Sequence, residues 1–270
     1  MEDLKGKTAL ITGASSGFGA DFAHILAQKG MNLVITARRE EKLNSLKQEI
    51  ETKYGVKTRV IVMDLAGFEA AEELYSKVCN ENIVMLINNA GYGMYNFFTR
   101  QNTVELNKMI QLNVVSAMTL ANLFAKDFSA KNFGFILNVA SFAAFNPTPF
   151  YAVYGATKAF LMNFSNAIRT ELLKQGKKVF VTAFCPGFTD TEFVERANQK
   201  RSWFLEKTIG KSYPAAEEAI AGLLKNAPIV MPRFINRFAA LCLRFLPRST
   251  ASKLTLMSIG NQEKSQYSEK

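Results

Sequence analysis

Short β-branched segments alternate with amphipathic segments along most of this 270-residue chain. The β-branched segments have the length of strands, and the segments between them repeat apolar residues every three to four positions, as helices do. A strand, a helix and a further strand in succession form a parallel pair with a right-handed crossover. The predicted strands span residues 7–12, 32–37, 58–64, 82–89, 134–141, 178–186 and 227–232. We therefore expect an α/β fold with a doubly wound, parallel, seven-stranded sheet and helices on both faces.

The length suits a single α/β domain of this kind. Hydrophobic residues make up 48% of the sequence, which is enough for a sizeable core. We predict one domain over residues 1–231 and a C-terminal extension over residues 232–260. Residues 261–270 are polar, and we predict that they form a disordered tail.

The N-terminus carries charged residues before a short apolar run and lacks the features of a secretory signal. No run approaches the roughly 18 apolar residues that a spanning helix needs. Cys79, Cys185 and Cys242 are far apart in the sequence and fit neither a disulfide framework nor a metal site. We expect a cytoplasmic protein with reduced thiols and no metal ion.

Lysine and arginine outnumber aspartate and glutamate by 33 to 23, giving a formal net charge of +10. An excess of this kind is a feature of proteins that bind nucleic acids. Here it is concentrated in one region, because residues 219–262 contain basic residues and no acidic residue. The chain shows no recognised nucleic-acid-binding module, so nucleic acid is not a predicted partner.

The first predicted strand runs directly into TGASSGFGADF, residues 12–22. Gly13, Gly17 and Gly19 let the backbone approach a ligand and let the next helix pack closely, while free N–H groups at the helix N-terminus attract an anion. A pyrophosphate fits this arrangement, although the G-x-x-x-G-x-G spacing is also compatible with a purely structural turn. No G-K-[ST] follows, which excludes a P-loop.

The end of the second predicted strand is where a dinucleotide-binding fold reads the ribose of its cofactor. An acidic residue there binds the ribose of NAD, whereas an arginine accommodates the 2′-phosphate of NADP. This sequence has Arg38 and Arg39 at that place, and a guanidinium binds a phosphate that a carboxylate would repel. NADP is therefore favoured over NAD. The alternative is that the arginines open an exposed helix and pair with Glu40 and Glu41.

Two tyrosines and one lysine occur in YAVYGATKAF, residues 151–160. On a helix Lys158 lies one turn from Tyr154, whereas Tyr151 faces Gly155. A free tyrosine has a pKa of about 10, and a neighbouring ammonium favours the phenolate and lowers that pKa toward the working range. The pattern favours Tyr154 as the reactive tyrosine; the alternative is an ordinary aromatic residue of an amphipathic helix.

Several motifs follow one another in an order and at separations typical of a single family. They are TGASSGFG at 12–19, NNAG at 88–91, Asn113, Ser141, YGATK at 154–158 and PGFTDTEF at 186–193. Residues 5 to about 231 therefore resemble the short-chain dehydrogenase/reductase family, in its single-domain, NADP-preferring branch. The resemblance implies a Rossmann-type fold, hydride transfer between NADP(H) and a small-molecule carbonyl or alcohol substrate, and a homodimer or homotetramer.

The resemblance also implies the roles of individual residues. The catalytic tetrad would be Asn113, Ser141, Tyr154 and Lys158, in which the serine holds the substrate oxygen, the tyrosine passes it a proton, and the asparagine holds a water that supplies protons to the lysine. The expected cofactor-binding residues are Gly13, Ser15, Ser16, Gly17, Phe18, Gly19, Arg38, Arg39, Asp64, Leu65, Asn89, Ala90, Gly91, Tyr154, Lys158, Pro186, Gly187, Thr189 and Thr191. Phe18 departs from the aliphatic residue that is usual in the family.

Two other functions are compatible with such a chain: a protein that senses NADP without turnover, and an isomerase or dehydratase on the same fold. The intact tetrad favours the oxidoreductase. Aromatic residues are frequent in the segments that border the active-site mouth in this fold, namely Tyr92, Phe142, Phe145, Phe150, Phe188, Phe193, Trp203 and Phe204. They predict an apolar substrate such as an acyl chain, a steroid or a hydrophobic ketone.

Residues 232–249 show the pattern of a basic amphipathic helix between two prolines. Apolar side chains at 234, 238, 241 and 245 form one stripe, and arginines at 233, 237, 244 and 248 form an adjoining one. Three roles are compatible with this pattern: packing on the domain or on another subunit, covering the substrate cleft, and peripheral membrane contact through residues 232–253. Packing is the first expectation and membrane contact the second.

Overall fold

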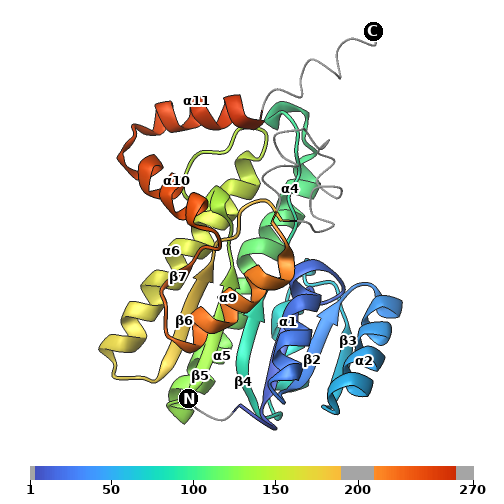
Figure 1. Cartoon of the computed structure of the whole chain (residues 1–270). Helices are drawn as coiled ribbons and strands as arrows, with labels where there is room; N and C mark the ends of the chain where they lie inside the picture. Colours follow the sequence, from blue (N-terminus) through green and yellow to red (C-terminus); the bar gives the residue numbers. More distant parts are fainter. Residues whose placement is uncertain (1–3, 190–209, 260–270) are drawn as a thin grey trace.

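The computed structural model describes residues 4–189 and 210–259 of the chain. Its centre is a parallel sheet with the strand order β3-β2-β1-β4-β5-β6-β7 (Figure 1). The strands are β1 (Thr8–Thr12), β2 (Asn32–Ala37), β3 (Thr58–Val62), β4 (Ile83–Asn88), β5 (Gly134–Val139), β6 (Val179–Phe184) and β7 (Ile229–Val230). Each predicted strand segment contains one observed strand, so the predicted Rossmann-type α/β fold is confirmed.

The strand order creates a crevice at the centre of the sheet. From β1 the chain builds outward through β2 and β3, and it then returns to β4 on the other side of β1. The connections on the two sides therefore leave in opposite directions, and the carboxyl ends of β1 and β4 open the kind of crevice in which α/β sheets bind ligands. Residues that are far apart in the sequence meet there.

Helices cover both faces of the sheet. They are α1 (Gly17–Gln28), α2 (Glu40–Tyr54), α3 (Ala70–Val78), α4 (Thr103–Ile110), α5 (Ala117–Lys131), α6 (Ala152–Lys174), α9 (Ser212–Leu224), α10 (Phe234–Phe245) and α11 (Arg248–Ile259). One buried apolar cluster joins the sheet to α1, α2 and α9, and another joins it to α3, α5 and α6. Because successive strand side chains point to opposite faces, Ala9 and Ile11 belong to the first cluster and Leu10 to the second.

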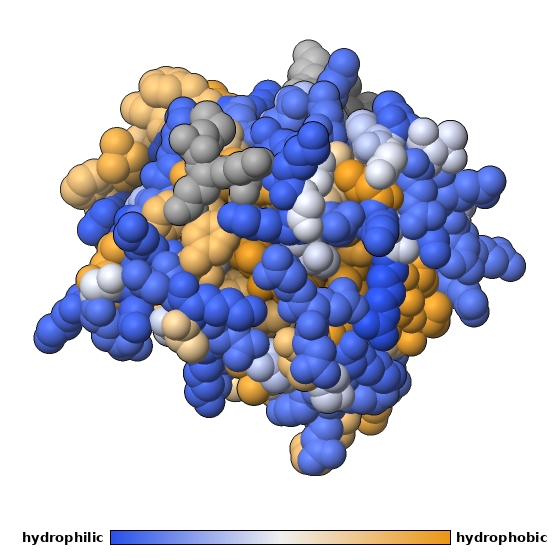
Figure 2. Space-filling model, turned by 90° about the horizontal axis from the view of Figure 1, so that it is seen from below, coloured by the Kyte–Doolittle hydropathy of each residue, from blue (hydrophilic) through white to orange (hydrophobic). Residues whose placement is uncertain are grey.

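The first two helices each end at a glycine. The C-cap of α2 is Gly55, with a left-handed φ of 68°, and Gly30, with a φ of 77°, follows the C-cap of α1. Each glycine lets the chain turn immediately into the next strand. These turns lie at the amino ends of the strands, away from the crevice. Seen from below, the surface of the molecule is mostly hydrophilic, with smaller hydrophobic areas between the polar side chains (Figure 2).

The C-terminal extension contains the predicted helix and a further one. The predicted helix is α10, which begins after Pro232 and ends before Pro247. The sequence analysis did not predict α11, which follows almost at once. Both helices lie at the upper end of the molecule in Figure 1, beyond the sheet. The predicted tail, residues 261–270, lies outside the described residues, and no helix within the described ranges is long and apolar enough to cross a bilayer.

The helix α10 packs on the domain through the face opposite its apolar stripe, with Ala240 buried. In the stripe, Phe234 and Phe245 are each 79% exposed and Phe238 and Leu241 are more than half exposed, so the stripe does not pack on its own domain. The other part of the expectation, packing of the extension on another subunit, stays a prediction. The inner face carries smaller and more polar side chains, so helical periodicity marked the stripe but not the face that is buried against the domain.

The fold predicts a large difference between two phenylalanine truncations. Phe124 of α5 is 2% exposed within the second cluster, whereas Phe68 is 87% exposed. We expect Phe124→Ala to lower the free energy of unfolding by about 3–5 kcal/mol and Phe68→Ala to change it by less than about 0.5 kcal/mol. Urea unfolding followed by circular dichroism measures both. Equal effects would contradict the assignment of α5 to the core.

Candidate active site

A single cavity of about 700 Å³ runs along the carboxyl ends of the strands. The glycine turn after β1 lines one end, and the inner faces of α10 and α11 line the other. Between these ends lie Ser141, Tyr154 and Lys158, three members of the predicted tetrad. The volume is within the range of small-molecule and cofactor sites. The cavity therefore brings together the two halves of the predicted site.

In the glycine turn three backbone segments approach one another so closely that only glycine leaves room for them. Gly13 has a left-handed φ of 66°, and a Cβ atom there would lie 2.8 Å from the Cα of Ala90. A Cβ atom at Gly19 would lie 2.3 Å from the carbonyl oxygen of Gly13. Gly13 and Gly17 line the cavity, whereas Gly19 does not. Gly19 thus serves the close packing of α1 against the turn and is not itself placed to touch a ligand.

Thr12 fastens the turn to the end of β4. Its hydroxyl oxygen accepts hydrogen bonds from the backbone N–H groups of Asn89 (3.0 Å) and Ala90 (2.9 Å). The side-chain amide of Asn89 donates in return to the carbonyl oxygens of Thr12 (2.9 Å) and Gly13 (3.1 Å). Asn89, Ala90 and Gly91 all line the cavity, as predicted for cofactor-binding residues. Thr12 was not singled out from the sequence, since its hydroxyl is one of many at strand ends.

Arg39 bridges the end of β2 and the glycine turn. Its Nη2 donates to Ser16 Oγ at 2.7 Å and to Ser15 Oγ at 3.0 Å, and its Nε donates to Ser15 Oγ at 3.2 Å. All three residues line the cavity, together with Phe18. Phe18 also packs edge-on against Phe184, with ring centroids 5.1 Å apart. The unusual aromatic residue is therefore accommodated by the core below the turn.

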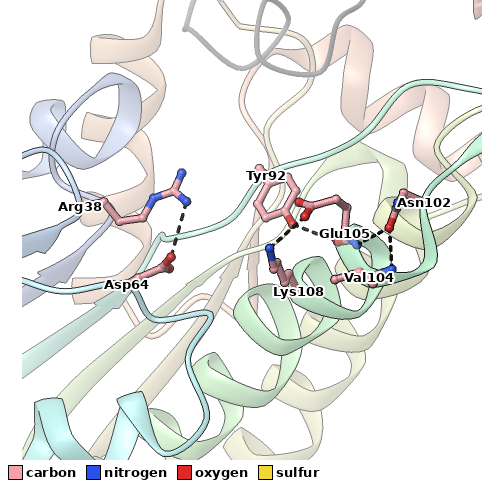
Figure 3. Close-up of polar contacts among 7 residues, drawn as sticks. All are labelled: Arg38, Asp64, Tyr92, Asn102, Val104, Glu105 and Lys108. Carbon is pink, nitrogen blue, oxygen red and sulfur yellow. Dashed lines mark hydrogen bonds and ion pairs between the residues drawn. The ribbon is translucent and has the colours of Figure 1, made fainter.

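Arg38 follows β2 and pairs with Asp64, which follows the neighbouring strand β3. Its Nη1 is 3.6 Å from Asp64 Oδ2, and both side chains are more than half exposed (Figure 3). Figure 3 also shows Tyr92 beside this pair, with its hydroxyl donating to the backbone oxygen of Glu105 in α4 at 3.0 Å. Arg38, Asp64, Leu65 and Tyr92 all line the cavity. An exposed pair of this kind is weak and leaves the guanidinium able to bind an anion.

The residues at this end fit a dinucleotide. The N-terminus of α1 and two guanidinium groups supply positive potential for phosphates. Thr36, at the end of β2, lines the cavity, and its buried hydroxyl oxygen has no hydrogen-bond partner among the described residues. A buried hydroxyl without a partner is costly unless a ligand or water satisfies it. The glycine turn, the cations and this hydroxyl together match the polar groups of a nicotinamide dinucleotide.

Ser141 and Tyr154 meet in the middle of the cavity. Ser141 follows β5, and its hydroxyl oxygen accepts a hydrogen bond from the N–H of Ala143 at 3.1 Å, at the start of the short helix η3 (Phe142–Ala144). Tyr154 comes from the first turn of α6 and shares a hydrogen bond with the Ser141 side chain. Both hydroxyl groups are therefore positioned against one point of the cavity.

Lys158 is buried one helical turn beyond Tyr154, with 4% of its surface exposed. Its Nζ donates to the carbonyl oxygen of Val139, the last residue of β5, at 2.7 Å. It lies 5.7 Å from the centroid of the Tyr154 ring. The prediction that these two side chains share a helix face is therefore confirmed. The hydrogen bond of the ammonium goes to the carbonyl oxygen of Val139.

The effect of Lys158 on Tyr154 differs from our expectation. We expected the ammonium to lower the pKa of the tyrosine, but burial raises the pKa of Tyr154 to about 12 and outweighs the lowering by the Ser141 hydrogen bond. Burial likewise lowers the pKa of Lys158 to about 8. Removal of water penalises both charged forms, and this penalty is larger here than the attraction between them. The structure therefore holds Tyr154 as a neutral phenol.

Asn113 stands behind the cavity and does not line it. It is fully buried in a π-helical turn, η2 (Gln111–Ser116), between α4 and α5. Its Oδ1 accepts from the N–H of Tyr92 at 3.1 Å, and its Nδ2 donates to the carbonyl of Tyr92 (2.9 Å) and to Thr157 Oγ1 (3.1 Å). Thr157 in turn donates to the carbonyl of Tyr154 at 2.7 Å. Asn113 thus links the segment after β4 to the helix that carries Tyr154.

The segment after β6 closes the side of the cavity. Pro186, Gly187 and Thr189 line it as predicted, and the carbonyl of Pro186 accepts from the N–H of Phe142 at 2.8 Å. This bond holds the segment beside Ser141. The predicted Thr191 lies outside the described residues, as do the wall residues Phe193, Trp203 and Phe204.

The substrate end of the cavity is more apolar than the cofactor end and differs in part from the predicted wall. Tyr92, Phe142 and Phe188 line it as expected, whereas Phe145 and Phe150 do not. Phe150 packs outside, against Tyr95 and Phe97. Further lining comes from the segment after Ser141, with Ala143, Asn146, Thr148 and Tyr151, and from the extension, with Ile235, Asn236, Ala239, Cys242, Leu243, Leu246, Leu254 and Thr255. Covering the substrate cleft was one of the roles that the sequence pattern allowed for this helix, but the pattern did not identify the individual residues. Most of them lie on the face of α10 opposite the marked apolar stripe or on the unpredicted α11.

Asn146 joins the extension to the site. Its side-chain amide donates a hydrogen bond to Thr255 Oγ1 of α11. Its side-chain oxygen is buried without a partner among the described residues, and the residue lines the cavity. The side-chain oxygen of Asn146 is therefore a buried acceptor in a largely apolar wall. No sequence motif marks Asn146, since its partner is 109 positions away.

Comparisons with known proteins agree with this geometry. A family model described as short chain dehydrogenase matches residues 7–202. Over 234 residues the chain is 33% identical to hydroxysteroid dehydrogenase-like protein 1 of Gallus gallus, covering 83% of this chain and 68% of that protein. Over 186 residues it is 36% identical to the very-long-chain 3-oxoacyl-CoA reductase of Meyerozyma guilliermondii, covering 65% of this chain and only 54% of that protein.

A solved structure is similar over almost the whole chain. It is a short-chain dehydrogenase from Sphingobium yanoikuyae in complex with NADPH, which matches with a TM-score of 0.79 and 29% sequence identity. The match covers 87% of this chain and 92% of the solved one.

The buried ammonium predicts a pH-dependent stability. Because folding lowers the pKa of Lys158 from 10.5 to about 8, the unfolded chain binds more protons there between these values, and stability rises with pH across this window. A Lys158→Met variant lacks this contribution. We expect the wild-type protein to gain about 3 kcal/mol relative to this variant between pH 8 and pH 10.5.

Urea unfolding of both proteins at each pH measures the effect. Lys174→Met, at the exposed end of α6, is the control and should show no such change relative to the wild type. Parallel stability curves for the wild type and Lys158→Met would show that the ammonium is not buried.

Proposed function

The chain belongs to the short-chain dehydrogenase family of oxidoreductases, and we propose that it is an NADP(H)-dependent enzyme that interconverts a carbonyl group and a secondary alcohol on a hydrophobic substrate. One observation supports this proposal above the others. Ser141, Tyr154 and Lys158 stand at the junction between a dinucleotide-shaped crevice and an apolar chamber within one cavity. A protein that only sensed the cofactor would need the first part of this cavity and not the second.

In the crevice lined by Gly13, Arg38 and Arg39, NADPH would be held so that its chemistry, hydride donation to a carbonyl carbon, would be available for the reduction. Tyr154 supplies the proton: its pKa of about 12 keeps the hydroxyl neutral, so it acts as an acid toward the oxygen that gains charge. Ser141 accepts from the N–H of Ala143 and shares a hydrogen bond with Tyr154, so its hydroxyl group lies beside the phenol and would donate to the same substrate oxygen. Oxidation of the alcohol is the reverse of this sequence.

Lys158 and Asn113 support Tyr154 in this proposal. Once the proton has left, the ammonium of Lys158 stabilises the phenolate, and this attraction is strong because the site is buried. A pKa of about 8 keeps most of the lysine protonated near neutral pH. Asn113 holds the position of α6 through Thr157, so we assign it a positioning role in addition to the water-mediated one that the family resemblance implies.

Arg38 and Arg39 support NADP over NAD. Both line the cavity at the end of β2, and Arg39 is already oriented by Ser15 and Ser16. A planar guanidinium held in this way binds a phosphate with little loss of side-chain entropy. The relative from Sphingobium yanoikuyae was solved with NADPH, which agrees with this preference.

The apolar chamber supports a hydrophobic substrate. Side chains from α10 and α11 lengthen the cavity away from Tyr154, so it suits an elongated molecule better than a small polar one. The names of two relatives point to steroids and to very-long-chain acyl groups. We also propose a homodimer or homotetramer, as the family resemblance implies, and a cytoplasmic location, for which the free cysteines are the support.

Replacement of the Tyr154 hydroxyl tests the proposed chemistry. We expect Tyr154→Phe to lower kcat/KM for ketone reduction by about 10²- to 10⁴-fold, because general acid catalysis contributes about this factor. Tyr151→Phe, which removes a neighbouring buried hydroxyl, should retain activity. The measurement follows NADPH absorbance with ketones and aldehydes of graded chain length, and NADPH fluorescence confirms that cofactor binding persists. If Tyr154→Phe stays as active as Tyr151→Phe, the proposed role is wrong.

Replacement of the arginines tests the cofactor preference separately. We expect Arg38→Gln and Arg39→Gln each to weaken NADPH binding about tenfold to a hundredfold and to leave NADH binding unchanged. Lys53→Gln, at the far end of α2, is the control for a general loss of positive charge. Fluorescence titration gives all of these affinities. Equal affinity of the wild type for NADH and NADPH would overturn the preference for NADP.

A further inference from the structure

The outer face of α10 carries an aligned row of exposed apolar side chains. Phe234, Phe238, Leu241 and Phe245, here called the outer stripe, are 79%, 56%, 53% and 79% exposed. Their spacing of four, three and four residues keeps them on one side of the helix over its whole length. Soluble proteins rarely leave contiguous apolar patches of this kind uncovered. We therefore expect a binding partner to cover the outer stripe.

The helix itself is held in place by its other face. Asn236, Ala239 and Leu243 line the cavity, and Ala240 is buried. Asn236 donates to the carbonyl of Pro232 at 3.0 Å, and Arg237 donates to the carbonyl of Met231. Because α10 is anchored from within, the outer stripe is a fixed and outward-facing surface.

Basic residues border the outer stripe without acidic residues between them. Residues 219–262 contain no aspartate or glutamate. Arg237 and Arg244 are helical neighbours of the stripe, three residues from Phe234 and Leu241 respectively. Arg237 also pairs with Glu218 of α9 at 3.3 Å. Arg244 and the nearby Arg248 make no ion pair within the part of the chain that the structure describes, so their charge faces solvent.

The second helix of the extension continues this surface. Leu254, Leu256 and Met257 of α11 are exposed, and Lys253 adds a further positive charge. In Figure 1 both helices stand together at the upper end of the molecule. Exposed apolar side chains and uncompensated cations thus occur together at this one end.

We infer that the outer stripe docks on the surface of a lipid bilayer that contains anionic lipids. A helix with aromatic and leucine side chains on one face and arginines beside them is the type that lies in the interface of a membrane. The apolar residues enter the acyl boundary, and the arginines meet the lipid phosphates. A folded protein partner would need a surface that matches the shape of the outer stripe, whereas a bilayer adapts to it without a matching shape.

A second copy of the chain is a poorer occupant for electrostatic reasons. A two-fold interface through this face would place the same patch against itself. Arg244 and Arg248 of one copy would then meet those of the other, and residues 219–262 contain no acidic residue that could compensate their charge. Like charges brought together in this way disfavour the complex. An anionic surface supplies the opposite charge that the patch lacks.

The inference does not rest on the proposed function, but the two are spatially connected. The inner face of α10 lines the apolar chamber while its outer face meets the lipid. One helix diameter, about 10 Å, therefore separates the bilayer from the chamber. An apolar substrate dissolved in the membrane would lie close to the substrate end of the cavity.

Vesicle flotation of the full chain tests the inference. We expect binding to vesicles of phosphatidylcholine with phosphatidylserine, weak binding to phosphatidylcholine alone, and loss of binding as salt screens the arginines. The double variant Phe234→Ser/Phe245→Ser should bind at least about tenfold more weakly, because each phenylalanine loses its burial in the acyl region. Arg244→Gln/Arg248→Gln should bind about twentyfold more weakly to the anionic vesicles.

The matched control is Phe68→Ser/Phe98→Ser, which removes two exposed phenylalanines elsewhere and should bind as the wild type does. Circular dichroism and NADPH affinity show whether each variant is folded. If the phenylalanine variant is not folded, the arginine variant alone tests vesicle binding. Two outcomes would overturn the inference. In the first, the wild type binds neutral and anionic vesicles equally well. In the second, Phe234→Ser/Phe245→Ser and Arg244→Gln/Arg248→Gln both bind anionic vesicles as well as the wild type does. A third outcome would also overturn it: the wild type forms a dimer in analytical ultracentrifugation and does not bind vesicles, and Phe234→Ser/Phe245→Ser is a monomer.

Discussion

The burial of one ammonium group without a carboxylate partner among the described residues governs the arrangement of the site. Lys158 donates to the carbonyl of Val139 at 2.7 Å, which is available because β5 ends there. Gly91 approaches from the other side, where a Cβ atom would lie 3.4 Å from Nζ and 2.9 Å from Asn113 Oδ1. A buried cation held only by neutral groups favours any negative charge that forms nearby. In the proposed function, this constraint would connect the binding of an anionic cofactor with the formation of a phenolate at Tyr154.

The cavity is built by different physical means at its two ends. At the cofactor end, close backbone contacts, a helix N-terminus and two arginines create a fixed, positively charged crevice. At the substrate end, α10 and α11 supply apolar side chains, and Asn146 joins them to the segment that carries Ser141. The outer face of α10 is apolar as well, so one helix serves as a wall of the chamber and as an exposed surface. The C-terminal extension therefore belongs to the site.

Much of the fold and the cofactor end could be predicted from the sequence, for local reasons. The runs of β-branched residues predicted the strands. The three glycines of residues 12–19 predicted the turn, because a close approach of the backbone requires glycine. Tyr154 and Lys158 were paired correctly by helical spacing. Three features were not predictable in this way. The hydroxyl of Thr12 acts across 77 positions, Asn146 meets Thr255 across 109 positions, and the raised pKa of Tyr154 depends on burial that no local pattern reports.

The sequence by itself determined the order of the strands and helices, the positions of the turns and the residue types at the strand ends, because each depends on neighbours within a few positions. Only the tertiary structure decided which face of α10 is buried, which members of the tetrad reach the cavity, and whether a tyrosine beside a lysine is more or less acidic. These depend on desolvation and on contacts between distant segments. Helical periodicity identifies a stripe on α10 but not the direction in which that stripe points.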